Sequence, residues 1–372
     1  MPSPSHTPPS FLKDAIPLEQ VHRVLIIKLR HHGDVLVSSP VFSVLKNHAP
    51  HCAIDALVYA DTAEMLTEHP AIEQVFTLDR NWKKQGPIAQ FRAEYGVFSQ
   101  LKQRQYDLII HLTEHWRGAW LVRLLKPRWS VAYRQPKYGK RWSSRFTHLV
   151  ENPKNALRNM VEAQLDSLRR IGLQPREEER KLCLIPGENA KVSIRSHLAG
   201  LGLENKGFIH LHPASRWFFK CWTIEKMAEL INTLHREGWP VVLTAAPSPD
   251  ELAMVSAIQA RLDQPAHSLA GQLSLKELAA LSAQARLFIG VDSAPMHMAA
   301  AVATPVVALF GPSGDKQWGA WPSGAPVRLV TSTAHPCRPC GIDGCGGGKV
   351  SDCLVRIPVE AVLDATHALL KP

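Results

Sequence analysis

Residues 287–313 read LFIGVDSAPMHMAAAVATPVVALFGPS and decide the fold. Two apolar runs of strand length, 287–291 and 305–310, flank the helix-capping pair Asp292 and Ser293 and a short helical segment. Strand, polar turn, helix and strand together form a βαβ unit. Open α/β sheets bind ligands at the carboxyl ends of their strands, and a helix N-terminus there favours anions. An ordinary βαβ crossover without a ligand is the alternative interpretation.

The same alternation of apolar runs and helical segments extends over the rest of the chain. It predicts further strands at residues 24–29, 53–58, 75–78, 107–112, 128–133, 207–211, 240–245 and 267–269. The composition changes at residues 174–188, where two prolines and three consecutive glutamates occur. The prediction is an α/β chain with two Rossmann-like domains that face each other across a cleft.

The predicted domains are therefore bounded by this change of composition. The first Rossmann-like domain comprises residues 23–180 and the second residues 181–355. Residues 1–22 contain several prolines and no apolar core of a secretory signal, and they are predicted to be a disordered leader. Residues 356–372 are predicted to form a terminal helix that packs back toward the first domain.

Charge indicates the kind of partner. The 372 residues include 43 Lys and Arg against 33 Asp and Glu, which gives a net charge of +10. This excess suits a polyanion such as nucleic acid, an anionic membrane face or a phosphorylated substrate, although positive charge can also serve solubility alone. The basic residues concentrate at positions 80–84 and 134–145, and no apolar stretch is long enough to span a membrane.

Polar residues at predicted strand ends are the candidates for chemistry. Asp34 follows the first strand and stands at a helix start, where it could act on a ligand or merely cap the helix. Lys220 shortly precedes a helix start and could meet a diphosphate or remain an exposed loop cation.

A basic cluster with an aromatic centre follows the third predicted strand. Arg80, Lys83 and Lys84 surround Trp82, which can stack on a sugar while the cations pair with phosphates. A solvated basic loop is the equal alternative.

Four cysteines gather near the C-terminus, Cys337, Cys340, Cys345 and Cys353. The C-x2-C spacing followed by two more thiols could hold a structural zinc ion, but the later spacings are not those of a standard zinc ribbon. A local cluster of unliganded thiols is the alternative.

Three motifs together resemble the ADP-heptose:lipopolysaccharide heptosyltransferases, which have the GT-B fold. They are Gly33-Asp34, Lys220-x-Trp222 and the stretch 292–297 with its continuation to Ser313. The resemblance implies that Asp34 is the general base and that the first domain binds the acceptor through Arg80, Lys83 and Lys84. It implies nucleotide-sugar contacts from Ser215, Lys220, Asp250, Asp292, Ser293, Ala294 and His297, with Ser248 as the alternative to Asp250 at the ribose.

The resemblance also implies a reaction. It is the transfer of heptose from ADP-L-glycero-D-manno-heptose to the lipopolysaccharide inner core, which is expected to be phosphorylated. Residues 23–36 and 107–120 are most similar to the members that add the third, branching heptose to the second. The chain contains no Asp-x-Asp pair, so we expect inverting transfer that needs no metal and no other cofactor.

The expected setting is the anionic cytoplasmic face of the inner membrane in a Gram-negative cell, where the protein would be peripheral, without a nucleic-acid partner. Three alternatives stay open at this point. They are an inner-core heptosyltransferase of the first or second type, a sugar-nucleotide epimerase of the same fold, and a non-catalytic α/β protein that binds an anionic polymer.

Overall fold

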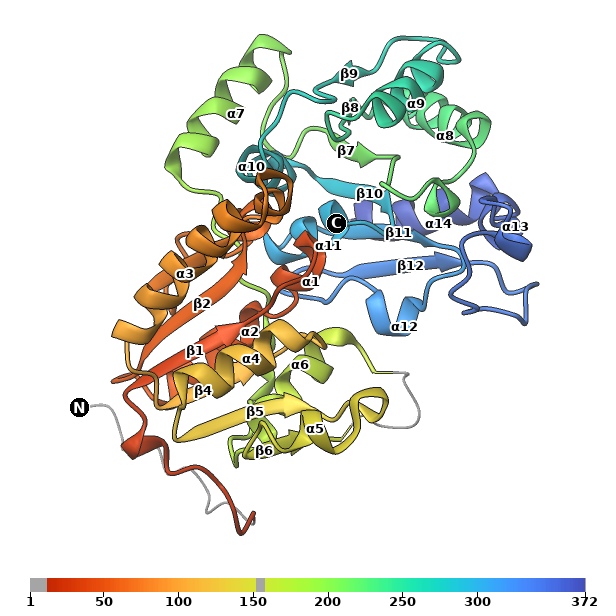
Figure 1. The fold of residues 1–372 in the computed structure, drawn as a ribbon. Helices are drawn as coiled ribbons and strands as arrows, with labels where there is room; N and C mark the ends of the chain where they lie inside the picture. Colours follow the sequence, from red (N-terminus) through yellow and green to blue (C-terminus); the bar gives the residue numbers. More distant parts are fainter. Residues whose placement is uncertain (1–11, 152–157, 372) are drawn as a thin grey trace. The chain divides into compact units, whose positions relative to one another are not determined.

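The computed structural model describes residues 12–151 and 158–371, and it consists of two compact units (Figure 1). The first unit ends at Arg180 and the second begins at Lys181, apart from a short segment before Met160 that belongs with the second. Each unit is built around its own six-stranded sheet, and every strand pairing in both sheets is parallel. The predicted α/β class with two Rossmann-like sheets is confirmed.

The first sheet has the strand order β3-β2-β1-β4-β5-β6. Its strands are β1 (Arg23–Ile27), β2 (Ala53–Tyr59), β3 (Gln74–Leu78), β4 (Leu108–His111), β5 (Trp129–Tyr133) and β6 (His148–Val150). The chain runs outward from β1 to β3 and then returns to β4 on the other side of β1. Strand order therefore reverses between β1 and β4, which is the topological switch point where such sheets bind ligands.

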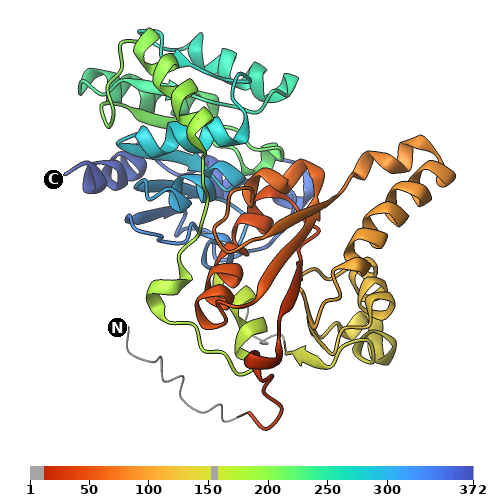
Figure 2. The same ribbon diagram turned by 90° about the vertical axis from the view of Figure 1, so that its left-hand side faces the viewer.

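Helices and 3-10 segments connect these strands. They are α1 (His32–Leu36), α2 (Ser39–His48), η2 (Ala60–Met65), η3 (Arg80–Gln85), α3 (Pro87–Gln103), α4 (Trp116–Leu125), η4 (Pro136–Tyr138), α5 (Gly139–Ser143), α6 (Met160–Arg169) and η5 (Glu177–Arg180). After β1, helices α1 and α2 are separated by Val37 and Ser38, and the basic stretch 134–145 contains η4 and α5. Helix α3 projects from the edge of its unit (Figure 2).

Residues 12–22 are ordered, so the prediction of a disordered leader is wrong for this segment. Ile16 and Val21 are buried, and the carboxylate of Asp14 lies 2.6 Å from the guanidinium of Arg170. These apolar and charged contacts attach the segment to the first unit, and the segment contains the 3-10 turn η1 (Leu18–Gln20). The rest of the predicted leader, residues 1–11, lies outside the described residues.

The second sheet has the order β12-β11-β10-β7-β8-β9. Its strands are β7 (Ile209–His212), β8 (Val241–Leu243), β9 (His267–Ser268), β10 (Leu287–Val291), β11 (Val306–Phe310) and β12 (Val327–Thr331). Here the order reverses between β7 and β10. Residues 287–291 form β10 as predicted, and all five are buried because β10 lies inside the sheet.

The second unit carries the remaining helices. They are α7 (Glu188–Gly200), η6 (Phe218–Lys220), α8 (Ile224–Arg236), α9 (Pro249–Gln259), α10 (Leu275–Gln284), α11 (Ala294–Ala301), α12 (Asp315–Trp318), η7 (Cys345–Gly347), α13 (Asp352–Val355) and α14 (Val359–Leu370). The terminal helix α14 packs on α8 and on strands β10, β11 and β12. It is thus part of the second unit, and its predicted packing toward the first domain stays a prediction.

A close contact between β4 and α4 fixes the centre of the first unit. A Cβ atom placed on Gly118 of α4 would lie 2.0 Å from Cε1 of His111, and that ring stacks on Phe146 at a centroid distance of 5.9 Å. Burial lowers the pKa of His111 to about 3, so the ring is neutral and behaves as a core side chain. Only glycine lets α4 approach the strand this closely.

We expect Gly118→Ala to lower the free energy of unfolding by about 1–3 kcal/mol, because the imidazole and the aromatic rings behind it must move. Urea unfolding followed by circular dichroism measures this change. Gly96→Ala in α3 is the matched control, because a Cβ there meets no atom within 4 Å. The control should be neutral or slightly stabilising, and equal losses in both variants would contradict the packing argument.

Candidate active site

Asp34 lies beside the switch point of the first sheet. It stands in the first turn of α1, directly after β1, and its side chain is 14% exposed. The Nε of Arg30 is 3.9 Å from Oδ1 of Asp34, which is too long for a hydrogen bond. The carboxylate is therefore largely buried next to a positive charge, but it accepts no hydrogen bond from Arg30. Gly33, which precedes Asp34, is an ordinary helical residue of α1.

A buried lysine lies behind this carboxylate. Lys28 is 3% exposed, and its Nζ donates a hydrogen bond of 3.1 Å to the carbonyl of Leu112 at the end of β4. Burial lowers the pKa of Lys28 to about 8, and the negative charge of Asp34 opposes this shift. The sequence interpretation missed Lys28, although a cation inside the apolar run VLIIKL was the available signal.

His115, just beyond the end of β4, is surrounded by positive charge. Its Nδ1 accepts a hydrogen bond of 3.2 Å from the backbone N–H of Arg117, which caps α4. Partial burial lowers the pKa of His115, and nearby cations lower it further, namely Arg117, Lys83, Arg30 and Lys137. The sequence interpretation also missed His115. The cations around it come from four loops and create an electropositive edge at the switch point.

Of the three predicted acceptor residues, Arg80 is held by hydrogen bonds, whereas Lys83 and Lys84 are exposed. Arg80 donates to Oδ2 of Asp61 at 2.6 Å and to the carbonyl of Arg30 at 2.8 Å, so its guanidinium is held next to the loop that carries Asp34. Lys83 and Lys84 are exposed at the end of η3. The structure thus places Arg80 and Lys83 near the Asp34 loop, and Lys84 follows directly.

Lys220 and Asp292 meet at the switch point of the second sheet. Lys220 ends η6, which follows β7, and Asp292 follows β10, so adjacent strands deliver the two residues to one edge. The Nζ of Lys220 is 2.6 Å from Oδ2 of Asp292, and the side chains are only 18% and 9% exposed. The ammonium also lies 5.1 Å from the ring centroid of Trp217. The ion pair is neutral overall and places one ammonium group at this edge of the sheet.

The remaining predicted residues of this edge cluster around α11. Ser293 is its N-cap, and its Oγ donates to the carbonyl of Val291 rather than accepting from the helix. Ala294 is the first helical residue, and His297 follows one turn later at 4% exposure. The first N–H groups of a helix lack intrahelical partners and suit an anion. Ser215, after β7, is also buried.

Two neighbouring acids, Asp250 and Glu251, stand in the first turn of α9 after β8. Asp250 is exposed in the first turn of α9, whereas its neighbour Glu251 is buried. Oε2 of Glu251 accepts a hydrogen bond of 3.0 Å from the N–H of Ala246, and Ser248 caps the helix. Glu251 is therefore a second candidate for a ribose contact beside the predicted Asp250.

The structure does not support the predicted zinc site. Cys353 is buried and the other three cysteines are exposed, and burial raises the pKa of Cys353. Within residues 12–151 and 158–371, no group of three or more His, Cys, Asp or Glu side chains is arranged to hold a metal ion. Structural zinc and unliganded thiols therefore both stay predictions for these cysteines.

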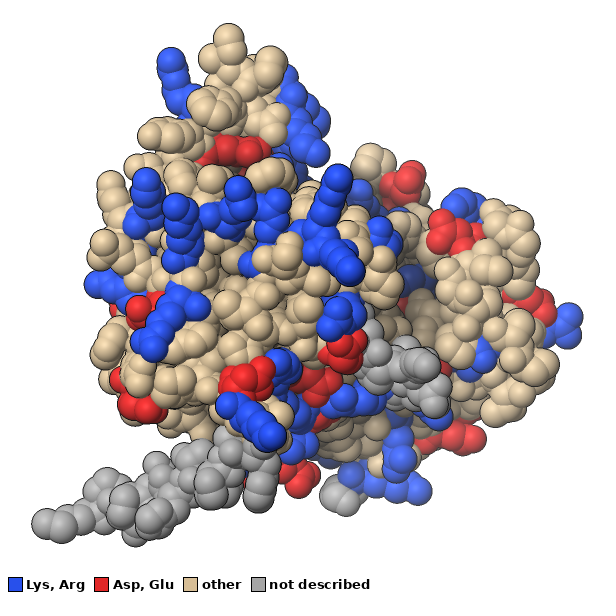
Figure 3. All heavy atoms as spheres, turned by 60° about the horizontal axis from the view of Figure 1, so that its bottom comes forward, with Lys and Arg blue, Asp and Glu red and all other residues tan. Residues whose placement is uncertain are grey.

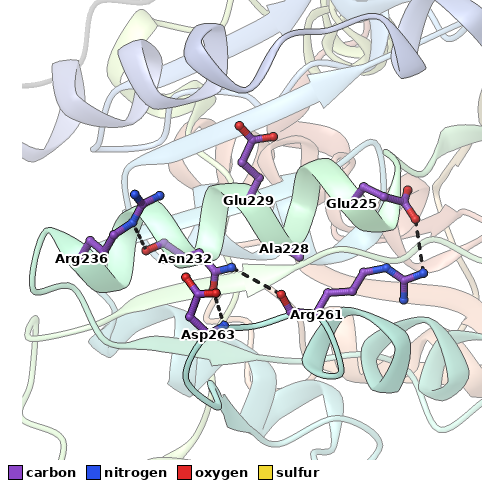
Figure 4. A pocket seen from close by; sticks show the side chains of 7 residues that line it. All are labelled: Glu225, Ala228, Glu229, Asn232, Arg236, Arg261 and Asp263. Carbon is purple, nitrogen blue, oxygen red and sulfur yellow. Dashed lines mark hydrogen bonds and ion pairs between the residues drawn. The ribbon is translucent and has the colours of Figure 1, made fainter.

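A shallow cavity of about 330 Å³ lies elsewhere on the second unit, between α8 and the end of α9 (Figure 4). Its walls carry opposite charges that pair with one another, since Arg261 lies 3.5 Å from Glu225, and Asn232 bridges to the backbone of Asp263. None of the predicted site residues lines it. Its lining residues lie on α8 and after α9, away from the strand ends at the two switch points.

The side chains at the switch points of the two sheets are suited to different chemical steps. The first offers a carboxylate, Asp34, among cations, which can accept a proton from a bound hydroxyl group. The second offers Lys220 and helix N–H groups, which can balance the charge of a phosphate or diphosphate.

The family assignment follows from sequence comparison. The model of glycosyltransferase family 9, the heptosyltransferase family, matches residues 95–345. The chain belongs to glycosyltransferase family 9. Lipopolysaccharide heptosyltransferase 3 of Escherichia coli is 37% identical over 299 residues, which cover 79% of this chain and 84% of the relative. The resemblance drawn from the three motifs is confirmed, and the protein is a glycosyltransferase.

Solved structures agree with this assignment at the level of the fold. A family 9 glycosyltransferase from Veillonella parvula superimposes with a TM-score of 0.81 at 20% identity, covering 96% of this chain and 99% of the other. ADP-heptose lps heptosyltransferase II of E. coli superimposes with a TM-score of 0.71 at 21% identity, covering 94% and 98%. This family 9 enzyme therefore has the GT-B fold. Across the described part of the chain, no helix has the length and apolar character needed to cross a bilayer.

We expect the burial of Lys28 to make the stability of the enzyme pH-dependent. Its pKa is about 8 in the folded state against 10.5 ordinarily, so between these values the unfolded chain binds more protons. The cost of the buried charge is present below pH 8 and is relieved as the pH rises. The free energy of unfolding of the native protein, measured relative to that of Lys28→Met, should therefore increase by roughly 3 kcal/mol as the pH rises through this window.

Urea titrations at a series of pH values measure the difference. The exposed Lys102→Met variant is the control, and its difference from the native protein should not vary with pH. A pH-independent difference for Lys28→Met would show that the lysine has an ordinary pKa.

Proposed function

We propose that this enzyme transfers heptose from ADP-heptose to the lipopolysaccharide inner core, and that it adds the third, branching heptose. The observation that supports this best is the 37% identity to lipopolysaccharide heptosyltransferase 3 over most of both chains, against 27% for lipopolysaccharide heptosyltransferase 1 of Pseudomonas aeruginosa. A carboxylate at one switch point and a cation at the other are the groups that such a transfer requires.

The second unit would hold the donor. The diphosphate would take the place of the Asp292 carboxylate at Lys220, and the first N–H groups of α11 would face the same charge. Ser215, after β7, and His297, in α11, would contribute hydrogen bonds. Asp250, or Glu251 in its place, would accept hydrogen bonds from the ribose hydroxyls.

The first unit would provide the base and bind the acceptor. Asp34 would take the proton of the acceptor hydroxyl while that oxygen forms a bond to the anomeric carbon and the bond from this carbon to the ADP oxygen breaks. A single displacement of this kind inverts the anomeric centre. Arg30 lies beside Asp34 and Lys28 is buried behind it, and Arg80, Lys83 and Lys84 would meet phosphates on the inner-core sugars.

The departing ADP needs charge stabilisation. The sequence has no Asp-x-Asp pair of the kind that holds a metal on a nucleotide diphosphate, so we assign this role to Lys220 and the α11 N–H groups, without a metal. The enzyme would act at the cytoplasmic face of the inner membrane as a peripheral protein, with no nucleic-acid partner.

We expect Asp34→Asn to reduce kcat by about 10²–10⁴-fold, because the amide cannot accept the proton. The measurement is transfer of heptose from ADP-heptose to an inner-core acceptor that lacks the branch, with the product identified by mass spectrometry. The exposed Glu68→Gln variant, from the same unit, is the control and should keep full activity. Near-native turnover by Asp34→Asn would exclude this residue as the base, and native enzyme without product would exclude the proposed reaction.

We expect Lys220→Met to raise the Kd for ADP by about 10-fold or more, because a charge-assisted contact to the diphosphate is lost. Isothermal titration calorimetry with ADP measures the change, and UDP, NAD and an oligonucleotide test the selectivity of the native enzyme. Lys316→Met, an exposed lysine of the same unit, should leave the Kd unchanged. Equal Kd values for the two variants would remove Lys220 from the donor site, and preference for UDP or NAD would favour a different reaction.

A further inference from the structure

Large apolar side chains are exposed together on two helices of the first unit. Ile88, Phe91 and Tyr95 of α3 and Trp120 and Leu124 of α4 are between 52% and 79% exposed. The spacing of three and seven residues on α3, and of four on α4, puts each set on one helix face. Exposed apolar groups of this size gathered on neighbouring elements indicate an interaction surface.

Contacts hold these two helices and their rings together. Arg117 at the start of α4 pairs with Glu94 of α3 at 3.2 Å, so the two helices are in contact. The guanidinium of Arg145 lies 5.1 Å from the Trp120 ring centroid, and the rings of Phe91 and Tyr95 stack at a centroid distance of 6.1 Å. We call this surface the α3–α4 face.

Positive charge is concentrated in the same part of the chain. Residues 83–145 contain 14 Lys and Arg against three Asp and Glu, a net charge of +11, so the rest of the chain together is close to neutral. The three acids are Glu94, which pairs with Arg117, Asp107, which accepts hydrogen bonds from the N–H groups of His22 and Arg23, and Glu114. The surface turned forward in Figure 3 shows Lys and Arg side chains gathered with uncharged surface between them.

We propose that the α3–α4 face docks on a bilayer that contains anionic phospholipids. Apolar side chains of α3 and α4 would enter the headgroup region, while Arg92, Arg123 and Lys126 remain at the level of the phosphates. Each cation near an anionic surface adds attraction, and Trp and Tyr suit the boundary between apolar and polar regions. The proposal rests on the proposed function in one respect, which is that a lipid-anchored acceptor is reached from this surface.

The combination favours lipid over another macromolecule. A phosphate polymer would be met by the cations but would leave Ile88 and Leu124 exposed to water, since neither offers a ring for stacking. A protein interface is usually depleted of charge at its centre, whereas here basic residues of α3 and α4 alternate with the apolar ones. Shallow insertion satisfies both kinds of side chain.

The test is co-sedimentation of the full-length protein with vesicles. Vesicles of phosphatidylcholine mixed with phosphatidylglycerol should bind the native protein, and vesicles of phosphatidylcholine alone should bind it at least about tenfold less. The variant Ile88→Ser/Phe91→Ser/Tyr95→Ser should lose about tenfold or more of the binding to the mixed vesicles. Arg123→Glu/Lys126→Glu should lose a similar share of this binding. Added salt should also weaken the binding of the native protein to the mixed vesicles.

Val192→Ser/Ile342→Ser is the matched control, because it removes exposed apolar groups of the second unit and should leave vesicle binding unchanged. Circular dichroism and the affinity for ADP confirm that each variant is folded. Native binding by the α3 triple variant, equal binding to both kinds of vesicle, or a native dimer that this variant converts to a monomer would each overturn the proposal.

Failure of the proposed reaction is detected separately. Transfer to a lipid-free inner-core oligosaccharide does not require a bilayer, so the α3 variant should match native turnover in that assay while losing vesicle binding. If the native protein transfers no heptose but its vesicle binding still depends on the α3–α4 face, the reaction is refuted and the docking surface remains.

Discussion

All strands of a parallel sheet end at the same edge, and the order of the strands reverses once in each sheet of this protein. At β1 and β4 the reversal is reinforced by two cross-strand contacts, from Lys28 to the carbonyl of Leu112 and from the N–H of Leu29 to Thr113. At β7 and β10 it brings Lys220 to Asp292. Without this geometry, residues more than 70 positions apart in the chain could not share one edge.

The two edges use charge in different ways. At the first, a carboxylate lies among cations, and the buried ammonium of Lys28 has no close carboxylate bond to offset its desolvation. Burial of such a charge lowers the free energy of unfolding, and favourable packing elsewhere in the fold must compensate for it. The packing of His111 against Gly118 and the aromatic rings of the first unit is one source of that stability. Stability and chemistry are thus located on neighbouring strands.

Much of the fold could be predicted because its signals are local. Residues 287–291 form β10 with the predicted bounds, since an apolar run of strand length followed by a helix-capping pair leaves few alternatives. Strand β12 was missed because it lies at a sheet edge and only Val330 is buried. Tertiary contacts determine the burial of Lys28, of Glu251 rather than Asp250, and of Ile16 in the supposed leader, and no local pattern reports such contacts. The cysteine spacing suggested zinc, but spacing alone does not fix side-chain direction.

The ion pair between Lys220 and Asp292 has a consequence for turnover. In the proposed donor complex the diphosphate would compete with Asp292 for Lys220, because the protein already holds this carboxylate 2.6 Å from the ammonium. A diphosphate carries enough negative charge to displace a carboxylate, whereas a neutral nucleoside does not. When ADP dissociates, Asp292 would return to Lys220 and replace the lost contact, which would favour release of the product.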